Sequence, residues 1–263
     1  MEEKKQKSTA EEALEIKLSN IEKSGGSVSE NRRGNIHCIS IIGQIEGHYV
    51  LPEGQKATKY EHLLPLLVSV EEDDSVDGLL VLLNTMGGDV EAGLAIAEVI
   101  ASMKKPTVSL VLGGSHSIGV PLAAAAKRSL IVPTATMTLH PVRVSGTVIG
   151  VPQSFRYMSE MQNRIIRFIC SHSKADPATL EKLMMRPDQI ATDCGSVLEA
   201  QETVKHGIID EVGGLDRALD LLRRMSVKDS NYKNKNNSYS KNKCEKRKKQ
   251  SVSSKKAKTD HPN

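Results

Sequence analysis

The stretch LNTMGGD at residues 83–89 decides the fold, because the hydrophobic pattern changes within it. Residues 78–83 before it form an apolar run of strand length, whereas apolar side chains recur at helical spacing over residues 90–101. A second stretch, GGSHSIG at residues 113–119, also follows a strand-like run and precedes an Ala-rich segment that favours a helix. Each stretch therefore predicts a glycine-rich turn between a strand and a helix, an alternation that is typical of an α/β domain.

The same two patterns predict the other strands and helices of the chain. Strands are predicted over residues 36–45, 78–83, 107–112, 130–132, 136–139 and 208–212. Helices are predicted over residues 90–101, 120–126, 155–173, 180–185, 199–206 and 215–225. We expect one domain over residues 35–226, a flexible arm at residues 1–34, and a disordered tail at residues 227–263 that is rich in Lys, Asn and Ser.

The charge of the chain is unevenly distributed. The 263 residues carry a net charge of only +4, but residues 228–263 contain 12 basic and 3 acidic residues, a balance of +9, which leaves −5 for the remainder. Because the basic charge belongs to the tail and aromatic residues make up only 3% of the chain, we expect no nucleic-acid partner. Association with an anionic membrane surface is expected only through the tail, whose simpler interpretation is a solubilising extension.

Neither a cofactor nor a metal ion is expected. The four cysteines, Cys38, Cys170, Cys194 and Cys244, show no CxxC spacing, so neither a zinc site nor a redox pair is predicted. The glycine-rich stretches match neither the GxGxxG nor the GxxxxGK[ST] phosphate-binding motif. No apolar run approaches the roughly 18 residues that span a bilayer, and the first residues contain no signal-peptide core, so we expect a cytoplasmic protein.

Ser117 lies at a predicted helix start, where backbone N–H groups stabilise an anion. Without a phosphate motif, the better candidate for that anion is the oxyanion of acyl transfer. A serine nucleophile needs a base, for which His140 at a predicted strand end is the candidate, and Asp188 or Asp193 is the candidate carboxylate that orients it. The simpler interpretations are an N-cap for the serine and turn positions for the other three. His116 is interpreted as a packing or surface residue.

Four blocks of the sequence resemble the proteolytic subunit of the Clp protease, and they occur in the same order as in that family. The blocks are NTMGGDVEAGLAI at residues 84–96, the nucleophile block SIG at residues 117–119, MTLHP at residues 137–141, and the closing segment at residues 199–212. The resemblance extends over residues 36–225. Residues 43–48 (GQIEGH) and the region around His140 resemble more closely the branch of the family formed by the translocation-enhancing proteins.

The resemblance implies a serine endopeptidase that hydrolyses peptide bonds through an acyl-enzyme. The residues that it implies are Ser117 as nucleophile, His140 as general base, Asp188 as the third member, and the backbone amides of Gly88 and Ile118 as the oxyanion hole. Asp193 remains the alternative to Asp188 as the third member. The chain departs from the family where Thr85-Met86 replaces Ser-Pro and where His116 replaces a small residue.

The resemblance also implies an architecture and partners. The fold would be the ClpP/crotonase type, built of repeated β-β-α units, with residues 155–173 as a protruding handle helix. A homo-oligomeric ring would enclose the serines, so the substrates would be peptides or unfolded proteins, and an AAA+ unfoldase would be the partner that feeds them. The translocation-enhancing branch implies a role in preprotein export or signal-peptide clearance. The alternative is a non-catalytic scaffold or binding protein of the export pathway that keeps this fold.

Overall fold

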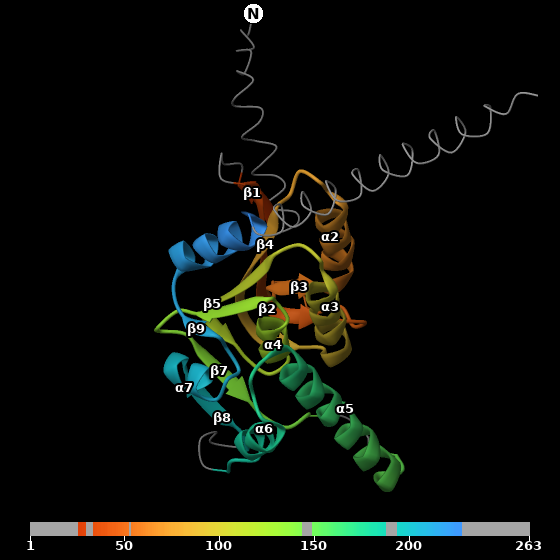
Figure 1. Ribbon diagram of the computed structural model, residues 1–263. Coiled ribbons are helices and arrows are strands. Elements are labelled where there is room, and N and C mark those ends of the chain that lie inside the picture. The colour runs from red at the N-terminus through yellow and green to blue at the C-terminus, as the bar shows by residue number, and fades with distance from the viewer. Residues whose placement is uncertain (1–25, 30–33, 53, 144–148, 188–193, 228–263) are drawn as a thin grey trace, which may run out of the picture. The chain divides into compact units, whose positions relative to one another are not determined.

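A sheet of mainly parallel strands lies at the centre of the fold (Figure 1). The computed structural model describes residues 26–29, 34–52, 54–143, 149–187 and 194–227. The described residues up to Arg223 belong to one compact unit, and the described residues from Arg224 to 227 belong to a second. Most of the expected arm and tail lies outside the described residues, so the flexibility expected of the arm and the disorder expected of the tail stay predictions.

The described part of the chain contains nine strands, the six helices α2 to α7, and one further helix near its C-terminal end. The strands are β1 (Gly26–Ser29), β2 (Ile36–Glu46), β3 (Ala57–Lys59), β4 (Gly78–Gly88), β5 (Thr107–Ser115), β6 (Arg128–Ile131), β7 (Thr136–Leu139), β8 (Ser196–Glu199) and β9 (Glu211–Val212). The helices are α2 (Tyr60–Glu72), α3 (Val90–Ser102), α4 (Gly119–Ala124), α5 (Val151–His172), α6 (Pro177–Met184) and α7 (Ala200–Lys205). A further helix begins at residue 215 and continues to residue 227.

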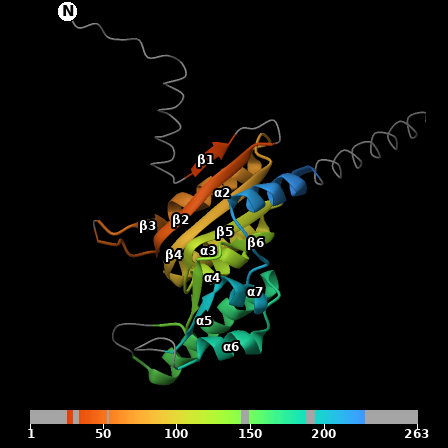
Figure 2. The same ribbon diagram turned by 90° about the vertical axis from the view of Figure 1, so that its left-hand side faces the viewer.

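The strand order brings the glycine-rich ends of β4 and β5 to the same edge of the sheet. The order is β1-β2-β4-β5-β6-β9, in which β1 is antiparallel to β2 and the other neighbours are parallel (Figure 2). β3 adds to β2, and β7 pairs with both β5 and β8. Because neighbouring parallel strands end at the same edge, the segments that follow β4 and β5 meet there.

The hydrophobic patterns explain why these segments form the core. In β4, Leu79, Val81 and Leu83 are fully buried. On the other face of the strand Leu80 is buried and Leu82 is partly buried, as in a parallel strand that has neighbours on both faces. All residues of α4 are buried, and its small alanine side chains allow the helix to pack close against the sheet. The predicted α/β class is confirmed, and β4 and β5 are neighbours in the sheet.

The structure corrects the position of the predicted turns. β5 continues through Ser115, so the glycines of the stretch at residues 113–119 belong to the strand rather than to the turn, and residues 116–118 make the turn. Backbone pairing on both sides keeps the glycines extended, because Ser115 pairs with Thr85 and Gly114 with Thr136. β4 likewise continues through its two glycines to Gly88.

Four elements have no counterpart in the sequence-based predictions: β1, β3, α2 and β8. β1 lies within the expected arm and pairs with β2. Pro65 lies inside α2, and a proline within a helical pattern normally argues against a helix. The strands β3 and β8 have only three and four residues, so their apolar alternation is too short to recognise.

The long helix α5 confirms the protruding handle (Figure 1). Its apolar stripe divides into two parts, since Met161, Ile165 and Phe168 are buried against the domain, whereas Phe155 nearer the helix start is 69% exposed. The stripe is therefore core over its second half and surface over its first. Neither α5 nor any other helix within the described ranges combines the length and apolar character that a membrane span requires.

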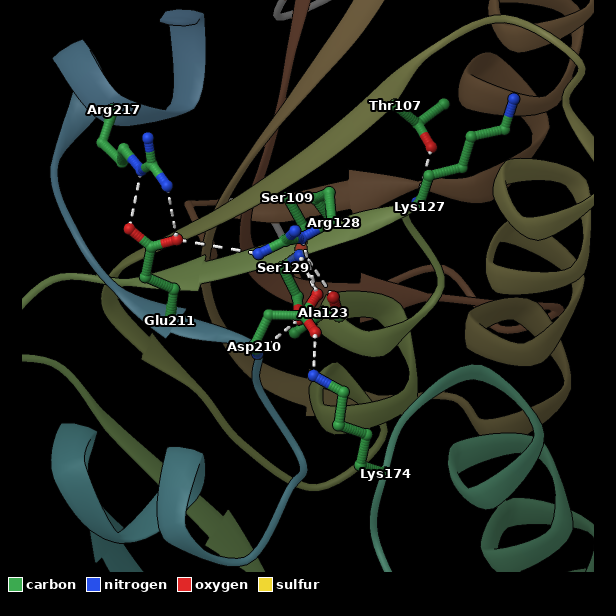
Figure 3. Close-up of polar contacts among 10 residues, drawn as sticks. All are labelled: Thr107, Ser109, Ala123, Lys127, Arg128, Ser129, Lys174, Asp210, Glu211 and Arg217. Carbon is green, nitrogen blue, oxygen red and sulfur yellow. Dashed lines mark hydrogen bonds and ion pairs between the residues drawn. The ribbon is translucent and has the colours of Figure 1, made fainter. Parts of the chain in front are cut away.

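An ionic network joins the far edge of the sheet to the segment after α5 (Figure 3). The Asp210 carboxylate accepts a hydrogen bond from the Ser129 amide at 3.1 Å and forms ion pairs with Arg128 and Lys174, each at 3.2 Å. Next to it, two hydrogen bonds from Arg217 hold the pKa of Glu211 below its ordinary value. The arginine and lysine side chains of these pairs are partly exposed, so each pair contributes little stability.

Candidate active site

A cleft of about 300 Å³ opens at the edge of the sheet where β4, β5 and β7 end. Its lining includes Gly88, Ser117, Ile118 and His140, which come from three different segments of the chain. The pairing of Thr85 with Ser115 brings the first two segments together. β7 pairs with β5 and leads directly into His140, so the third segment reaches the same edge.

Ser117 has an unusual backbone conformation. Its φ of 57° makes it the only non-glycine residue with a positive φ among the described residues. A residue with a Cβ atom in this left-handed region costs about 1 to 2 kcal/mol, so the neighbouring structure must hold it there. The Ser117 N–H donates to the Thr138 carbonyl at 2.8 Å, and the Ser117 carbonyl accepts from the Val120 N–H at 3.0 Å. Such locally supported strain is common at functional sites.

Two glycines let the end of β4 approach this turn. Gly87 has a φ of 91°, and a Cβ atom on it would lie 2.7 Å from the His116 carbonyl oxygen and 2.8 Å from the Ser117 Cβ. Gly88 has a φ of 151°, and its Cβ would lie 2.3 Å from the carbonyl oxygen of Ile45 on β2. Both positions therefore require glycine for conformation and for space.

The Ile118 amide remains free to bind a ligand. Its N–H has no hydrogen-bond partner among the described residues, whereas the amides on either side of it donate to Thr138 and His116. A Cβ on Gly87 would lie 3.4 Å from the Ile118 nitrogen, so this amide adjoins the end of β4. The Ile118 side chain is buried against Gly93 of α3, which anchors the residue.

The imidazole of His140 is held by the backbone that follows it. Its Nδ1 lies 2.7 Å from the Pro141 carbonyl oxygen, and because a carbonyl only accepts hydrogen bonds, Nδ1 carries the proton. In the neutral ring, Nε2 is then the nitrogen with a free lone pair, as a general base requires. His140 and Ser117 line the same cleft, although no hydrogen bond joins them in this structure.

The two candidates for the third residue, Asp188 and Asp193, lie outside the described residues. The ends of the loop that contains them are described, and the Gly195 N–H donates to the Arg186 carbonyl at 2.7 Å. Asp188 is two residues after one end of this loop base, and Asp193 is two residues before the other. Leu139, directly before His140, pairs with the residue after Gly195, so the base of the loop lies beside the backbone that leads into His140.

The cleft also contains residues that the sequence analysis did not assign to a site. Gln44 from β2, Gln162 and Ile165 from α5, Met184 from α6, and Arg143 form part of its wall. Gln44 lies in the stretch at residues 43–48 that resembles the translocation-enhancing branch, but that resemblance gave it no role. The other four come from segments far apart in the chain and share no motif. Over the ranges that the structure describes, no group of three His, Cys, Asp or Glu side chains has an arrangement that could hold a metal ion.

Comparison of the sequence with known proteins identifies relatives of this chain. The Clp protease family model matches residues 32–215. The chain is 52% identical over 202 residues to the translocation-enhancing protein TepA of Halalkalibacterium halodurans, a match that covers 77% of this chain and 79% of that protein. It is 26% identical over 160 residues to the ATP-dependent Clp protease proteolytic subunit of Streptococcus sanguinis, covering 57% of this chain and 76% of the relative.

The family match includes every residue that lines the cleft. It begins before β2 and ends after β9, so it spans the sheet, the handle helix and the segments that carry Ser117 and His140. The order of elements is that of a mixed α/β fold with a mainly parallel sheet, as the resemblance of the sequence blocks implied. This chain belongs to the Clp protease family.

Proposed function

We propose that the protein is a serine endopeptidase that hydrolyses peptide bonds through an acyl-enzyme on Ser117. The observation that carries the proposal is the strained Ser117 in one cleft with His140 and the amide of Ile118. A left-handed conformation at a serine is strained, and such strain is common at functional sites. The conformation places Ser117 at a sharp turn just beyond a strand end, as at the nucleophile of other serine hydrolases.

In the proposed reaction, the Ser117 Oγ attacks the peptide carbonyl while its proton passes to Nε2 of His140. The carbonyl oxygen becomes an oxyanion that accepts hydrogen bonds from the amides of Gly88 and Ile118. The tetrahedral intermediate then breaks its C–N bond, and His140 gives the proton to the departing amine. Water hydrolyses the acyl-enzyme by the same steps, with His140 again acting as base.

A third residue would orient His140 and stabilise its protonated form. We assign this role to Asp188, with Asp193 as the alternative, because the base of their loop adjoins His140. The Pro141 carbonyl already holds Nδ1 and fixes the tautomer, so the carboxylate would have to displace that contact or add to it. The step that gains most from a carboxylate is the one in which the imidazole carries a positive charge.

We further propose a homo-oligomeric ring as the working assembly, with an unfoldase of the AAA+ class as its partner and unfolded polypeptide as substrate. The family membership and the protruding, partly apolar start of α5 support this assembly. The similarity to a translocation-enhancing protein supports a role in preprotein export or in the removal of signal peptides.

A non-catalytic scaffold is the second candidate, and one observation favours it. Ser117 and His140 are not hydrogen-bonded to each other, so a proton transfer between them needs a movement of one side chain. In unliganded serine hydrolases such bonds are often long and tighten when substrate binds, which keeps the endopeptidase as our first choice.

The experiment that separates the two functions is labelling with a fluorophosphonate, in which Ser117 Oγ would bond to phosphorus and release fluoride. We expect the native assembly to be labelled and Ser117→Ala to remain unlabelled. His140→Ala should lower the rate of labelling by a factor on the order of a thousand. An assembled, folded sample that takes no label would favour the scaffold.

The third residue is tested by two isosteric variants. Asp188→Asn should lower the labelling rate far more than Asp193→Asn, because only the former would remove the charge that stabilises protonated His140. A ranking in the opposite order would assign the role to Asp193. Native mass measurement of both variants checks that the assembly is unchanged.

A further inference from the structure

His116 makes a contact that the proposed reaction does not use. Its Nδ1 lies 2.9 Å from the Oγ1 of Thr138 on β7. The carbonyl of the same threonine accepts the hydrogen bond from the Ser117 N–H at 2.8 Å. Two consecutive residues of the nucleophile turn therefore contact one residue of β7, and that residue lies two positions before His140.

The imidazole of His116 occupies a defined place. A Cβ atom on Gly114 would lie 2.2 Å from its Nε2 and 2.8 Å from its Cε1, so the ring covers the end of β5 where another residue would have a side chain. The ring is half-buried, and burial lowers its pKa, which keeps it neutral at neutral pH. A neutral ring can share one hydrogen bond with a threonine hydroxyl through either tautomer of Nδ1.

This side-chain contact matters because backbone pairing between β5 and β7 is short. The two strands share one register pair, Gly114 with Thr136, and β7 otherwise pairs with β8. The hydrogen bonds to Thr138 therefore supply much of the connection between the Ser117 turn and the strand that carries His140.

We propose that His116 is a positioning residue, which through Thr138 holds the Ser117 turn at the correct separation from His140. This inference rests on the function proposed above. It replaces the earlier interpretation of His116 as a packing or surface residue by a specific role. It also gives a reason why a large side chain stands beside this nucleophile, since a small residue could not reach Thr138.

The test compares variants that remove the contact with variants that keep it. His116→Ala and Thr138→Val each lose the hydrogen bond, and we expect each to lower the second-order rate of fluorophosphonate labelling about tenfold. His116→Asn places an amide group near the position of Nδ1, and Thr138→Ser keeps the hydroxyl, so both should stay within about threefold of the wild type.

A double variant and a surface control complete the comparison. His116→Ala combined with Thr138→Val should be no slower than either single variant, because both remove the same bond. His62→Ala, an exposed histidine on α2, should label at the wild-type rate. All rates are measured under conditions in which thermal unfolding shows every variant to be folded, so a loss of stability alone would not change them.

Amide hydrogen exchange tests the inference without any catalytic readout. The exchange rate of the Ser117 amide, which Thr138 protects, should rise about tenfold in His116→Ala and return toward the wild-type rate in His116→Asn. Unchanged exchange at Ser117 in His116→Ala would overturn the inference, whatever the labelling result. If the protein shows Ser117-dependent labelling that is insensitive to His116, the inference fails and the proposed function stands. If nothing is labelled, the function fails, and the exchange data still decide the role of His116.

Discussion

The ends of β4 and β5 lie side by side at the cleft, and a residue with a positive φ lies at or just after each of them. The two ends use different residue types in this conformation. Both require positive φ, and β4 meets the requirement with Gly87 and Gly88. β5 is followed by Ser117, which adopts a φ of 57° although it has a side chain. Glycine adopts this region at little cost, whereas serine is strained there.

The use of glycine at the end of β4 and of serine after β5 shows that only the second position needs a side chain. At the end of β4 only the backbone is used, and a Cβ atom would collide with β2 or with the neighbouring turn. At Ser117 a hydroxyl is needed, so the strain is retained and two backbone hydrogen bonds hold the residue in place. Strain at one end is thus supported by close packing at the other.

The largest expected effect is on stability in Gly88→Ala. The new Cβ would lie 2.3 Å from the Ile45 carbonyl oxygen at a φ of 151°, so we expect a loss of about 3 to 5 kcal/mol in the free energy of unfolding. Gly54→Ala is the matched control, because Gly54 has a φ of 88° with open space around it, and it should lose only about 1 to 2 kcal/mol. Urea denaturation measures both, and equal losses would show that the contact with β2 is unimportant.

A smaller loss is expected in Thr85→Val, which removes a bridge between the strands. The Thr85 hydroxyl donates to the Gly43 carbonyl at 2.6 Å and accepts from the Gly87 N–H at 3.1 Å. Valine would leave two polar groups without these partners, so we expect a loss of about 1 to 3 kcal/mol. Thr85→Ser keeps the hydroxyl and should lose less; if chemical denaturation finds the two variants equally unstable, the hydroxyl has no structural role.

Ser117→Gly should raise stability while it abolishes labelling. Removing the Cβ relieves the left-handed strain, so we expect a gain of about 1 kcal/mol, or about 2 to 4 °C in the unfolding midpoint. Ser117→Ala keeps the Cβ and should have nearly the wild-type midpoint. Scanning calorimetry distinguishes the two, and identical midpoints would mean that the backbone at Ser117 is not strained.

The smallest effect concerns pH and His116. Burial lowers its pKa from 6.5, so below that pH the unfolded chain binds a proton more readily than the folded protein. The stability that neutral His116 contributes is complete above pH 6.5 and is lost as the pH falls through the lower folded value. His116→Asn does not titrate, so its unfolding free energy should fall less steeply than that of the wild type between about pH 7 and about pH 5.

The difference between wild type and His116→Asn reports the contribution of His116 alone to the pH dependence of stability. Burial also lowers the pKa of His37, but that residue is present in both proteins, and its contribution cancels in the difference. Parallel denaturation curves at each pH provide the measurement. If wild type and variant lose stability in parallel, His116 is not protected from protonation by the fold.

Much of this arrangement could be predicted from short stretches of sequence. The helical patterns that follow Gly88 and Ser117 depend on neighbours in the chain, and the helices α3 and α4 form close to their predicted bounds. The ends of strands are harder to predict. Gly113 and Gly114 are typical turn residues, but pairing with β7 on one side and β4 on the other extends the strand through them.

The sequence by itself determined the α/β class and the candidate residues Ser117 and His140, because hydrophobic periodicity and motif spacing are local properties. Only the tertiary structure decided the left-handed conformation of Ser117, the free amide of Ile118, and the contact between His116 and Thr138. These features depend on which strands pair and at what register. Register depends on burial and hydrogen bonding over the whole sheet, so it cannot be predicted from any single short stretch of sequence.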